Sequence, residues 1–214
     1  MKIAIIGATG FVGSAVLSEA LQRGHEVTAI ARNVDKITSK SEKLTAIAAD
    51  VDDSVNLAGI LAGHDGIVSA YNAGWTNPNL YHDFIKGAEA IQQAAKLSGV
   101  KRLLVVGGAG SLEIAPGIQL VDSPEFPAEY KAGSTAARDY LNILKKETEL
   151  DWTFISPAIQ LHPGKRTAVF RLGTDQPVFD DNGKNDISVE DLAVAIIDEL
   201  ENNRFIRKRF TLGY

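Results

Sequence analysis

A turn of seven residues near the N-terminus, Gly7-Ala8-Thr9-Gly10-Phe11-Val12-Gly13, constrains the fold more than any other part of the chain. It joins residues 2–6, whose β-branched run predicts a strand, to residues 11–23, which predict a helix. Glycines at such a turn allow a tight bend and let a ligand come close to backbone N–H groups. The helix that follows directs the positive end of its dipole at the same place, which favours a bound diphosphate. The turn therefore predicts a dinucleotide cradle formed by Gly7, Thr9, Gly10, Phe11, Val12 and Gly13.

The spacing of the three glycines leaves a second interpretation open. It is G-x-x-G-x-x-G, whereas the usual dinucleotide fingerprint is G-x-G-x-x-G. A turn of this kind could serve only to pack the helix against the strand. The 19 glycines of the 214-residue chain nevertheless gather where a ligand would lie, because seven of them come at predicted carboxyl ends of strands: Gly7, Gly10, Gly13, Gly74, Gly107, Gly108 and Gly110.

Strand and helix patterns alternate along the first half of the chain. Apolar or β-branched runs predict strands at residues 2–6, 26–30, 44–48, 66–70 and 101–106. Helical patterns lie between them at residues 11–23, 54–61 and 77–97, and the last of these opens with Asn77-Pro78 and stops at Gly99. This alternation is typical of right-handed βαβ units. We therefore expect an α/β fold with a doubly wound parallel sheet that helices cover on both faces.

The pattern is looser after residue 110. It predicts a helix at residues 128–148, a strand at 152–156, strand-like pieces at 167–171 and 178–180, a turn at 181–183, a helix at 188–201 and a strand at 209–212. Ser188 and Asp191 have the spacing of a capping box. We expect one domain, residues 1–214, in which residues 1–110 form the core dinucleotide-binding half and residues 111–214 add the remaining strands and a small substrate lobe.

The end of the second predicted strand bears on the choice of dinucleotide. NAD sites place a carboxylate there for the ribose 2′-hydroxyl, whereas NADP sites place an arginine near the 2′-phosphate. Arg32 stands at this end, and no acidic residue follows until Asp35. This favours NADP(H), with NAD(H) still possible, although Arg32 could also be an ordinary solvated side chain. After the third strand, Asp50 and Val51 are candidates to contact the adenine, and Asp50 could alternatively cap the following segment.

Composition excludes several other classes of function. Lys and Arg number 22 against 27 Asp and Glu, a net charge of −5, so we expect no nucleic-acid partner and no binding to an anionic membrane. The chain has no cysteine and its four histidines lack the spacing of metal ligands, so we expect no metal site. No apolar run is long enough to span a membrane, and we expect a cytoplasmic protein. We interpret one basic cluster, with Glu199 and Glu201 beside it, as a solvated strand face: Arg204, Arg207, Lys208 and Arg209.

Several segments together carry a family resemblance. They are the glycine turn, Arg32, residues 69–74, residues 101–111, residues 151–158 and His162-Pro163-Gly164. Over essentially the whole chain the sequence resembles the atypical short-chain dehydrogenase/reductases, and within them the NmrA-like NAD(P)H-flavin reductases. The resemblance implies a Rossmann-like fold with a small C-terminal lobe over the nicotinamide end. It also implies further cofactor contacts at Ala70, Tyr71, Asn72, Gly107, Gly108 and Pro157.

The chain departs from related dehydrogenases in its acid–base residues. Those enzymes use a Tyr-x-x-x-Lys pair, in which the lysine lowers the pKa of the tyrosine. None of the five tyrosines here has a lysine at that spacing, and Gly107 and Gly108 stand where a catalytic hydroxyl is expected. Alcohol and ketone chemistry is therefore disfavoured. Hydride transfer to a planar flavin or quinone needs no dedicated acid–base residue, because positioning of the two reactants supplies much of the rate.

Three residues are candidates to contact such an acceptor: Ser111, Tyr130 and His162. Each lies on a segment that we expect at the carboxyl edge of the sheet. Each also has a structural alternative, since Ser111 could cap a loop, Tyr130 could pack its own helix and His162 could be an exposed turn residue. We expect an NADP(H)-dependent oxidoreductase. The alternatives are a non-catalytic dinucleotide sensor and a nucleotide-sugar epimerase or dehydratase, and the sequence leaves the oligomeric state open.

Overall fold

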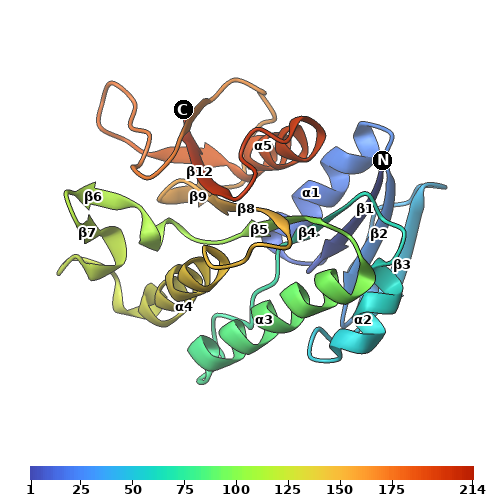
Figure 1. Ribbon diagram of the computed structural model, residues 1–214. Helices are drawn as coiled ribbons and strands as arrows, with labels where there is room; N and C mark the ends of the chain where they lie inside the picture. The colour runs from blue at the N-terminus through green and yellow to red at the C-terminus, as the bar shows by residue number, and fades with distance from the viewer.

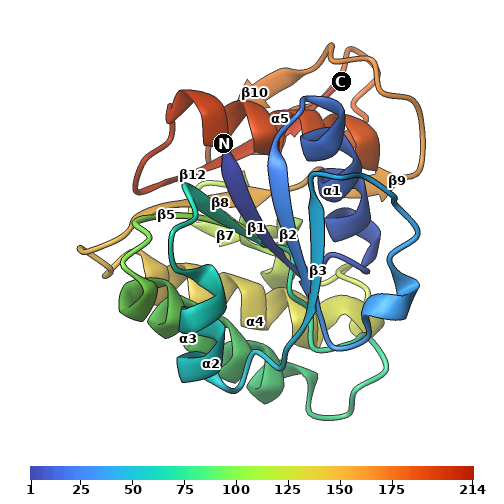
Figure 2. The same ribbon diagram turned by 90° about the vertical axis from the view of Figure 1, so that its right-hand side faces the viewer.

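One large β-sheet forms the centre of the protein, as Figures 1 and 2 show from two sides. A computed structural model describes residues 1–214. The eight strands of the sheet are β1 (Lys2–Ile6), β2 (Glu26–Ala31), β3 (Leu44–Ala48), β4 (Gly66–Ser69), β5 (Arg102–Val106), β8 (Asp151–Ser156), β10 (Arg171–Gly173) and β12 (Lys208–Gly213). Their order is β10-β12-β8-β5-β4-β1-β2-β3. Every neighbouring pair is parallel except β10 with β12.

Five helices cover the two faces of this sheet: α1 (Phe11–Gln22), α2 (Ser54–Leu61), α3 (Leu80–Ser98), α4 (Ala128–Leu144) and α5 (Val189–Asn202). Helices α1 and α5 pack on one face, and α2, α3 and α4 pack on the other. Each face has its own hydrophobic core, because alternate strand residues such as Ile5 and Ile6 point to opposite sides. The Rossmann-like, doubly wound fold is therefore confirmed. None of the helices combines the length and the apolar character that crossing a bilayer requires.

The strand order reverses between β1 and β4. From β1 the chain moves outward through β2 to β3, then returns to β4 on the other side of β1 and continues through β5 to β8. Such a reversal leaves a crevice at the carboxyl ends of the two central strands, because the segments that follow them diverge. The glycine turn follows β1 and residues 70–79 follow β4, so these two segments flank the crevice.

In the first half of the chain, the predicted elements are confirmed to within one residue at each end, with one exception. Helix α3 begins at Leu80 and not at Asn77. The Asn77 carbonyl accepts the Leu80 N–H at 3.1 Å, and its side-chain oxygen accepts the Asn79 N–H at 2.9 Å. Residues 77–79 therefore form a turn ahead of the helix. Gly99, with φ of 78°, ends the helix as predicted.

Two predicted features of the later helices are wrong in part. Helix α4 ends at Leu144 and not at residue 148, because the Glu147 carboxylate accepts the Glu149 N–H at 2.6 Å and fixes a turn there. Ser188 caps α5 as predicted, since its Oγ accepts the Asp191 N–H at 3.1 Å. The reciprocal bond of a capping box does not form, because the Ser188 N–H donates to the hydroxyl of the distant Tyr214 at 3.2 Å.

The chain after residue 110 contains short strands that the sequence pattern did not predict. Strand β6 (Glu113–Ala115) pairs with β7 (Ile118–Gln119), and β9 (Gln160–His162) pairs with β11 (Asp186–Ser188). Of the predicted strand at residues 167–171, only Arg171 enters β10, because Ala168 has a φ of 57° and interrupts the extended chain. Residues 178–180 form no strand and lead into the turn predicted at 181–183. These segments form a small lobe beside the carboxyl edge of the sheet (Figure 1).

Candidate functional site

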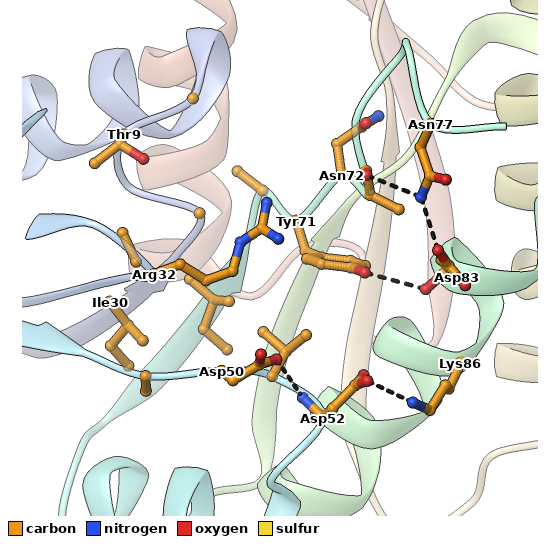
Figure 3. Close-up of a pocket in the computed structure, with 18 residues that line it drawn as sticks. Thr9, Ile30, Arg32, Asp50, Asp52, Tyr71, Asn72, Asn77, Asp83 and Lys86 are labelled. Carbon is orange, nitrogen blue, oxygen red and sulfur yellow. Dashed lines mark hydrogen bonds and ion pairs between the residues drawn. The ribbon is translucent and has the colours of Figure 1, made fainter. Parts of the chain in front are cut away.

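A cavity of about 300 Å³ opens at the crevice between β1 and β4. The residues that line it come from the carboxyl ends of the first four strands and from the start of α3. They include Gly7, Thr9, Gly10, Ile30, Arg32, Asp50, Val51, Asp52, Ala70, Tyr71, Asn72, Asn77, Asp83 and Lys86 (Figure 3). The structure therefore brings together nine of the fifteen residues that were predicted to contact a cofactor: Gly7, Thr9, Gly10, Arg32, Asp50, Val51, Ala70, Tyr71 and Asn72.

The glycine turn lies so close to its neighbours that side chains would not fit. A Cβ at Gly7, whose φ is 79°, would lie 2.6 Å from the Ala70 carbonyl oxygen. A Cβ at Gly13 would lie 2.1 Å from the Gly7 carbonyl oxygen, so Gly13 lets α1 pack against the turn. No side chain caps the first turn of α1, which begins after Gly10. Its N–H groups therefore remain available to an anion bound beside Gly10, at the edge of the cavity, and the packing role of Gly13 is compatible with a binding role for the turn.

Arg32 is an exposed cation at the edge of the cavity. Figure 3 shows its guanidinium group directed toward the ring of Tyr71. Arg32 forms no ion pair and donates no hydrogen bond within the protein. The other cation of the cavity, Lys86, is occupied, because its Nζ lies 2.5 Å from a carboxylate oxygen of Asp52. The Arg32 guanidinium is thus free to meet a phosphate group.

Asp50 lines the cavity but does not cap the helix that follows. Its Oδ1 accepts the Asp52 N–H at 3.1 Å, which closes a local turn. The cap of α2 is Asp53, whose Oδ1 accepts the Asn56 N–H at 3.0 Å. Asp50 therefore caps the short turn that follows it, as the alternative interpretation predicted, whereas Asp53 caps α2 because it directly precedes the helix.

Tyr71 forms one wall of the cavity. Its hydroxyl donates to the Asp83 carbonyl at 3.0 Å, and its ring lies against the backbone of α3 at Gly87, where a Cβ would be 2.5 Å from the ring. Burial raises the pKa of Tyr71, and the carboxylates of Asp52 and Asp83 raise it further. Sequence reasoning predicted Tyr71 at this edge but missed its packing against α3, although a glycine in the middle of a long helix was a signal of close packing.

Six predicted cofactor contacts do not line the cavity: Phe11, Val12, Gly13, Gly107, Gly108 and Pro157. Phe11, Val12 and Gly13 form the first turn of α1. Gly107 follows β5 and is a packing position, since a Cβ there would lie 1.9 Å from the Phe154 ring. Gly108 has open space, with no atom nearer to its Cβ position than 3.9 Å. Pro157 directly follows β8.

None of the three predicted acceptor contacts lines the cavity either. Ser111 is 1% exposed, and its Oγ accepts from Arg209 at 3.2 Å, so it lies within the protein and not on a binding surface. His162 is partly exposed, with Nδ1 3.0 Å from the Pro163 carbonyl and Nε2 3.1 Å from Asp186. Hydrogen bonding to Pro163 and Asp186 raises the pKa of His162. Tyr130 is exposed and lies edge-on to Trp75.

The interpretation of residues 204–209 as a solvated strand face is wrong for Arg209. Its side chain is buried, and it donates to Asp175, at 2.5 Å from Nη2, as well as to the hydroxyls of Ser111 and Ser156. Glu199 is also buried, and it pairs with Arg102 at 2.6 Å. Arg209 thus joins β12 to the lobe, and Glu199 joins α5 to β5. Arg204, Arg207 and Lys208 are exposed, as predicted. No three His, Cys, Asp or Glu side chains come together as metal ligands.

Comparison with known proteins agrees with the geometry of the cavity. Residues 7–203 match a protein family described as NAD(P)H-binding. The YwnB protein of Bacillus subtilis is 38% identical over 215 residues, which cover 99% of this chain and 98% of that protein.

Two solved structures are similar over the whole chain. A protein of Bacteroides thetaiotaomicron described as a "putative epimerase" is 48% identical with a TM-score of 0.93, covering 100% of this chain and 96% of that chain. A protein of Streptococcus pneumoniae described as a "putative NADH-flavin reductase" is 36% identical with a TM-score of 0.87, covering 100% and 99%. The likeness therefore includes the lobe as well as the sheet.

Proposed function

The chain belongs to the NAD(P)H-binding family, and from this premise we propose that it is an NADPH-dependent reductase that passes hydride to a small planar acceptor, a flavin or a quinone. A reduced nicotinamide supplies the hydride, and the acceptor gains that hydride together with one proton from water. The protein's part is to bind both partners in contact and to exclude other reactions.

The observation that carries the choice of NADPH is the free guanidinium of Arg32 inside a cavity whose other cation is already paired. The uncapped N–H groups at the start of α1 would hold the diphosphate, and Arg32 would hold the 2′-phosphate. Asp50 and Val51 would contact the adenine. Gly108 and Pro157, beyond β5 and β8, would flank the nicotinamide, because the dinucleotide extends along the carboxyl edge from the crevice.

The surroundings of Tyr130 favour an acceptor that needs no protein acid. The residue four positions later is Ser134, and the Nζ of Lys131 donates to the Val121 carbonyl. Neither residue places an ammonium group at the Tyr130 hydroxyl, as alcohol and sugar chemistry would require. The same feature argues against the epimerase alternative, even though one similar protein is described as an epimerase.

The test is NADPH oxidation by the purified protein, followed by the loss of its near-ultraviolet absorbance. FMN, FAD and quinones are supplied in turn, with NADH as the second cofactor. Because epimerisation consumes no net NADPH, the epimerase alternative is tested separately with UDP-glucose and NAD⁺ by the formation of UDP-galactose. We expect turnover with at least one planar acceptor and none with UDP-glucose. If NADPH binds but no acceptor accelerates its oxidation, the reductase proposal fails and the non-catalytic sensor stands.

A further inference from the structure

Two exposed aromatic side chains lie together beside the cavity. Trp75 is 56% exposed and Tyr130 is 49% exposed. Their ring centroids are 5.5 Å apart and the rings meet edge to face at 89°. Trp75 belongs to the loop between β4 and α3, whereas Tyr130 lies in the first turn of α4. Two segments far apart in the sequence therefore bring these rings to one place, and more than half of the tryptophan remains in contact with solvent.

The backbone of α4 is shaped to hold the indole ring. A Cβ at Gly133 would lie 2.8 Å from Cζ3 of Trp75 and 3.2 Å from Leu80, so only glycine leaves room for the ring here. Tyr130 lies one turn earlier on the same helix, and its ring stands perpendicular to the indole ring with the centroids 5.5 Å apart. An exposed tryptophan held in this way keeps one orientation. Preorganisation of this kind lowers the conformational entropy that the side chain loses when a ligand binds.

The position of Trp75 places it along the proposed path of the cofactor. The same loop contributes Tyr71, Asn72, Ala73 and Asn77 to the lining of the cavity. It begins at the carboxyl end of β4, which is the neighbour of β5 in the sheet. Figure 1 shows α3 and α4 side by side with their N-termini at this edge, below the lobe. An acceptor that reaches the nicotinamide from solvent would meet this ring pair.

We propose that Trp75, held in place by Tyr130 and Gly133, is the surface on which the planar ring of the acceptor stacks. A conjugated ring of the flavin or quinone class fits, because stacking on an indole face needs no matching pattern of hydrogen bonds. The Tyr130 hydroxyl has no partner in the protein and can donate to a ring carbonyl, which both classes carry. This inference rests on the proposed reductase function, because the acceptor defines the ligand.

Intrinsic fluorescence tests the contact without turnover. The chain has two tryptophans, and Trp152 is 3% exposed in β8, so its emission serves as an internal reference. FMN and a naphthoquinone are titrated separately into the protein saturated with NADP⁺, which cannot react. We expect either ligand to quench the red-shifted emission of Trp75 and to leave that of Trp152. Trp75→Leu should remove the saturable quenching, and equal saturable quenching in this variant would overturn the proposal.

Steady-state kinetics give a second, independent readout. Trp75→Leu should raise the KM for the acceptor about tenfold and leave the KM for NADPH unchanged, whereas Trp75→Phe should keep most of the affinity. Tyr130→Phe removes only the hydroxyl and should have a smaller effect than Tyr130→Leu. Leu97→Ala, at the opposite end of α3 and equally exposed, is the matched control. An unchanged acceptor KM in Trp75→Leu would contradict the platform while leaving the reductase function intact.

The two proposals fail in different ways. Saturable quenching by FMN or quinone without turnover would end the reductase proposal and keep Trp75 as a ligand contact. Turnover without quenching would end the platform alone. If Trp75→Leu instead changes only the molecular mass measured by light scattering, the ring pair is a contact between two copies of the chain and the platform is wrong.

Discussion

The glycine turn and the C-terminal lobe lie at the same edge of the sheet but are held together by different kinds of contact. In the turn, backbone meets backbone, as the positions of Gly7 and Gly13 against neighbouring carbonyl groups show. All of its glycines fall within seven consecutive residues. In the lobe, buried polar side chains make the contacts, and their partners lie far away in the sequence. The turn is therefore a local structure, whereas the lobe depends on the complete fold.

Asp191 is the centre of the contacts that hold the lobe. Its carboxylate is fully buried at the start of α5 and accepts the N–H groups of Thr167 and Ala168 at 2.7 and 2.8 Å. It also accepts the hydroxyls of Thr167 at 2.6 Å and Tyr214 at 2.8 Å. One side chain thus fixes the segment before β10, the start of α5 and the residue after β12. The contrast with the turn predicts that the two regions can be damaged separately.

The largest effect should come from Asp191→Ala. The change leaves two N–H groups and two hydroxyls without an acceptor in a buried place, so we expect the free energy of unfolding to fall by about 3 to 5 kcal/mol. Urea denaturation measures the loss. Where the variant is still folded, NADPH affinity should change little, because the cofactor cradle makes none of these contacts. A large loss of NADPH binding in the folded variant would contradict the separation of the two regions.

Two milder variants control for this change. Tyr214→Phe removes one of the four donors and should lose about 1 kcal/mol. Asp191→Asn tests the charge: burial raises the pKa of Asp191, but its hydrogen bonds from Thr167, Ala168 and Tyr214 lower it overall. A lowered pKa means that stabilisation is present above the unfolded value near 3.9 and is lost as the pH falls through the folded pKa. The Asn variant should therefore lose less stability on acidification than the wild type.

Gly13→Ala is the reverse experiment, because it damages the cradle and spares the lobe. Its Cβ would lie 2.1 Å from the Gly7 carbonyl, and neither backbone can move without shifting α1. We expect the Kd for NADPH to rise about 100-fold, about 2.7 kcal/mol. Calorimetric titration measures it. Gly59→Ala in α2 is the control, since nothing lies within 4 Å of its Cβ position, and it should bind NADPH normally.

The same contrast explains which features sequence reasoning could predict. The turn at residues 7–13, the position of Arg32 and the alternation up to β5 depend on near neighbours, and all were predicted from spacing. The strand-like piece at 167–171 was wrong because Ala168 takes a left-handed conformation that Asp191, more than twenty residues away, supports. Local pattern carries no information about such a contact.

The residues of the candidate site also divide into those that sequence reasoning could place and those that depend on distant contacts. Residues that follow a strand directly, such as Asp50 and Tyr71, were predicted at the carboxyl edge and do line the cavity. Asp83 and Lys86 were missed because their place depends on how α3 packs beside β4. Ser111 follows β5 closely in sequence, but Arg209 from the last strand holds it inside the protein. Proximity along the chain therefore predicted many of the residues that line the cavity, but it did not predict where Ser111 lies.

Arg32→Ala refines the comparison within the cradle, because it tests the proposed contact of Arg32 with the 2′-phosphate separately from the proposed diphosphate site at the glycine turn. Loss of one charge-assisted contact should weaken NADPH about 10- to 100-fold and NADH by less than about threefold. Binding titrations with both cofactors measure the ratio. Lys36→Ala, an exposed cation nearby that does not line the cavity, should leave both affinities unchanged. An equal loss for NADPH and NADH would contradict the 2′-phosphate assignment.

The smallest expected effect concerns His162. Its replacement tests whether the stability of the lobe depends on pH while cofactor binding at the cradle does not. Its two ring nitrogens face two acceptors, the Pro163 carbonyl and the Asp186 carboxylate, so only the imidazolium donates to both. These bonds raise the pKa of His162, whereas Lys184, 2.8 Å from Asp186, opposes them.

Because the folded pKa of His162 is raised, its stabilisation is complete below the unfolded value near 6.5 and is lost as the pH rises through the folded value. The side chain is partly exposed, so the change should be below about 1 kcal/mol. Thermal unfolding at about pH 6 and pH 8 measures it as the difference between wild type and His162→Gln, since every other side chain is the same in both proteins. NADPH affinity should show no such difference between the two proteins. If the difference appears in cofactor affinity instead, His162 acts on the cradle, and the two regions are coupled through the edge they share.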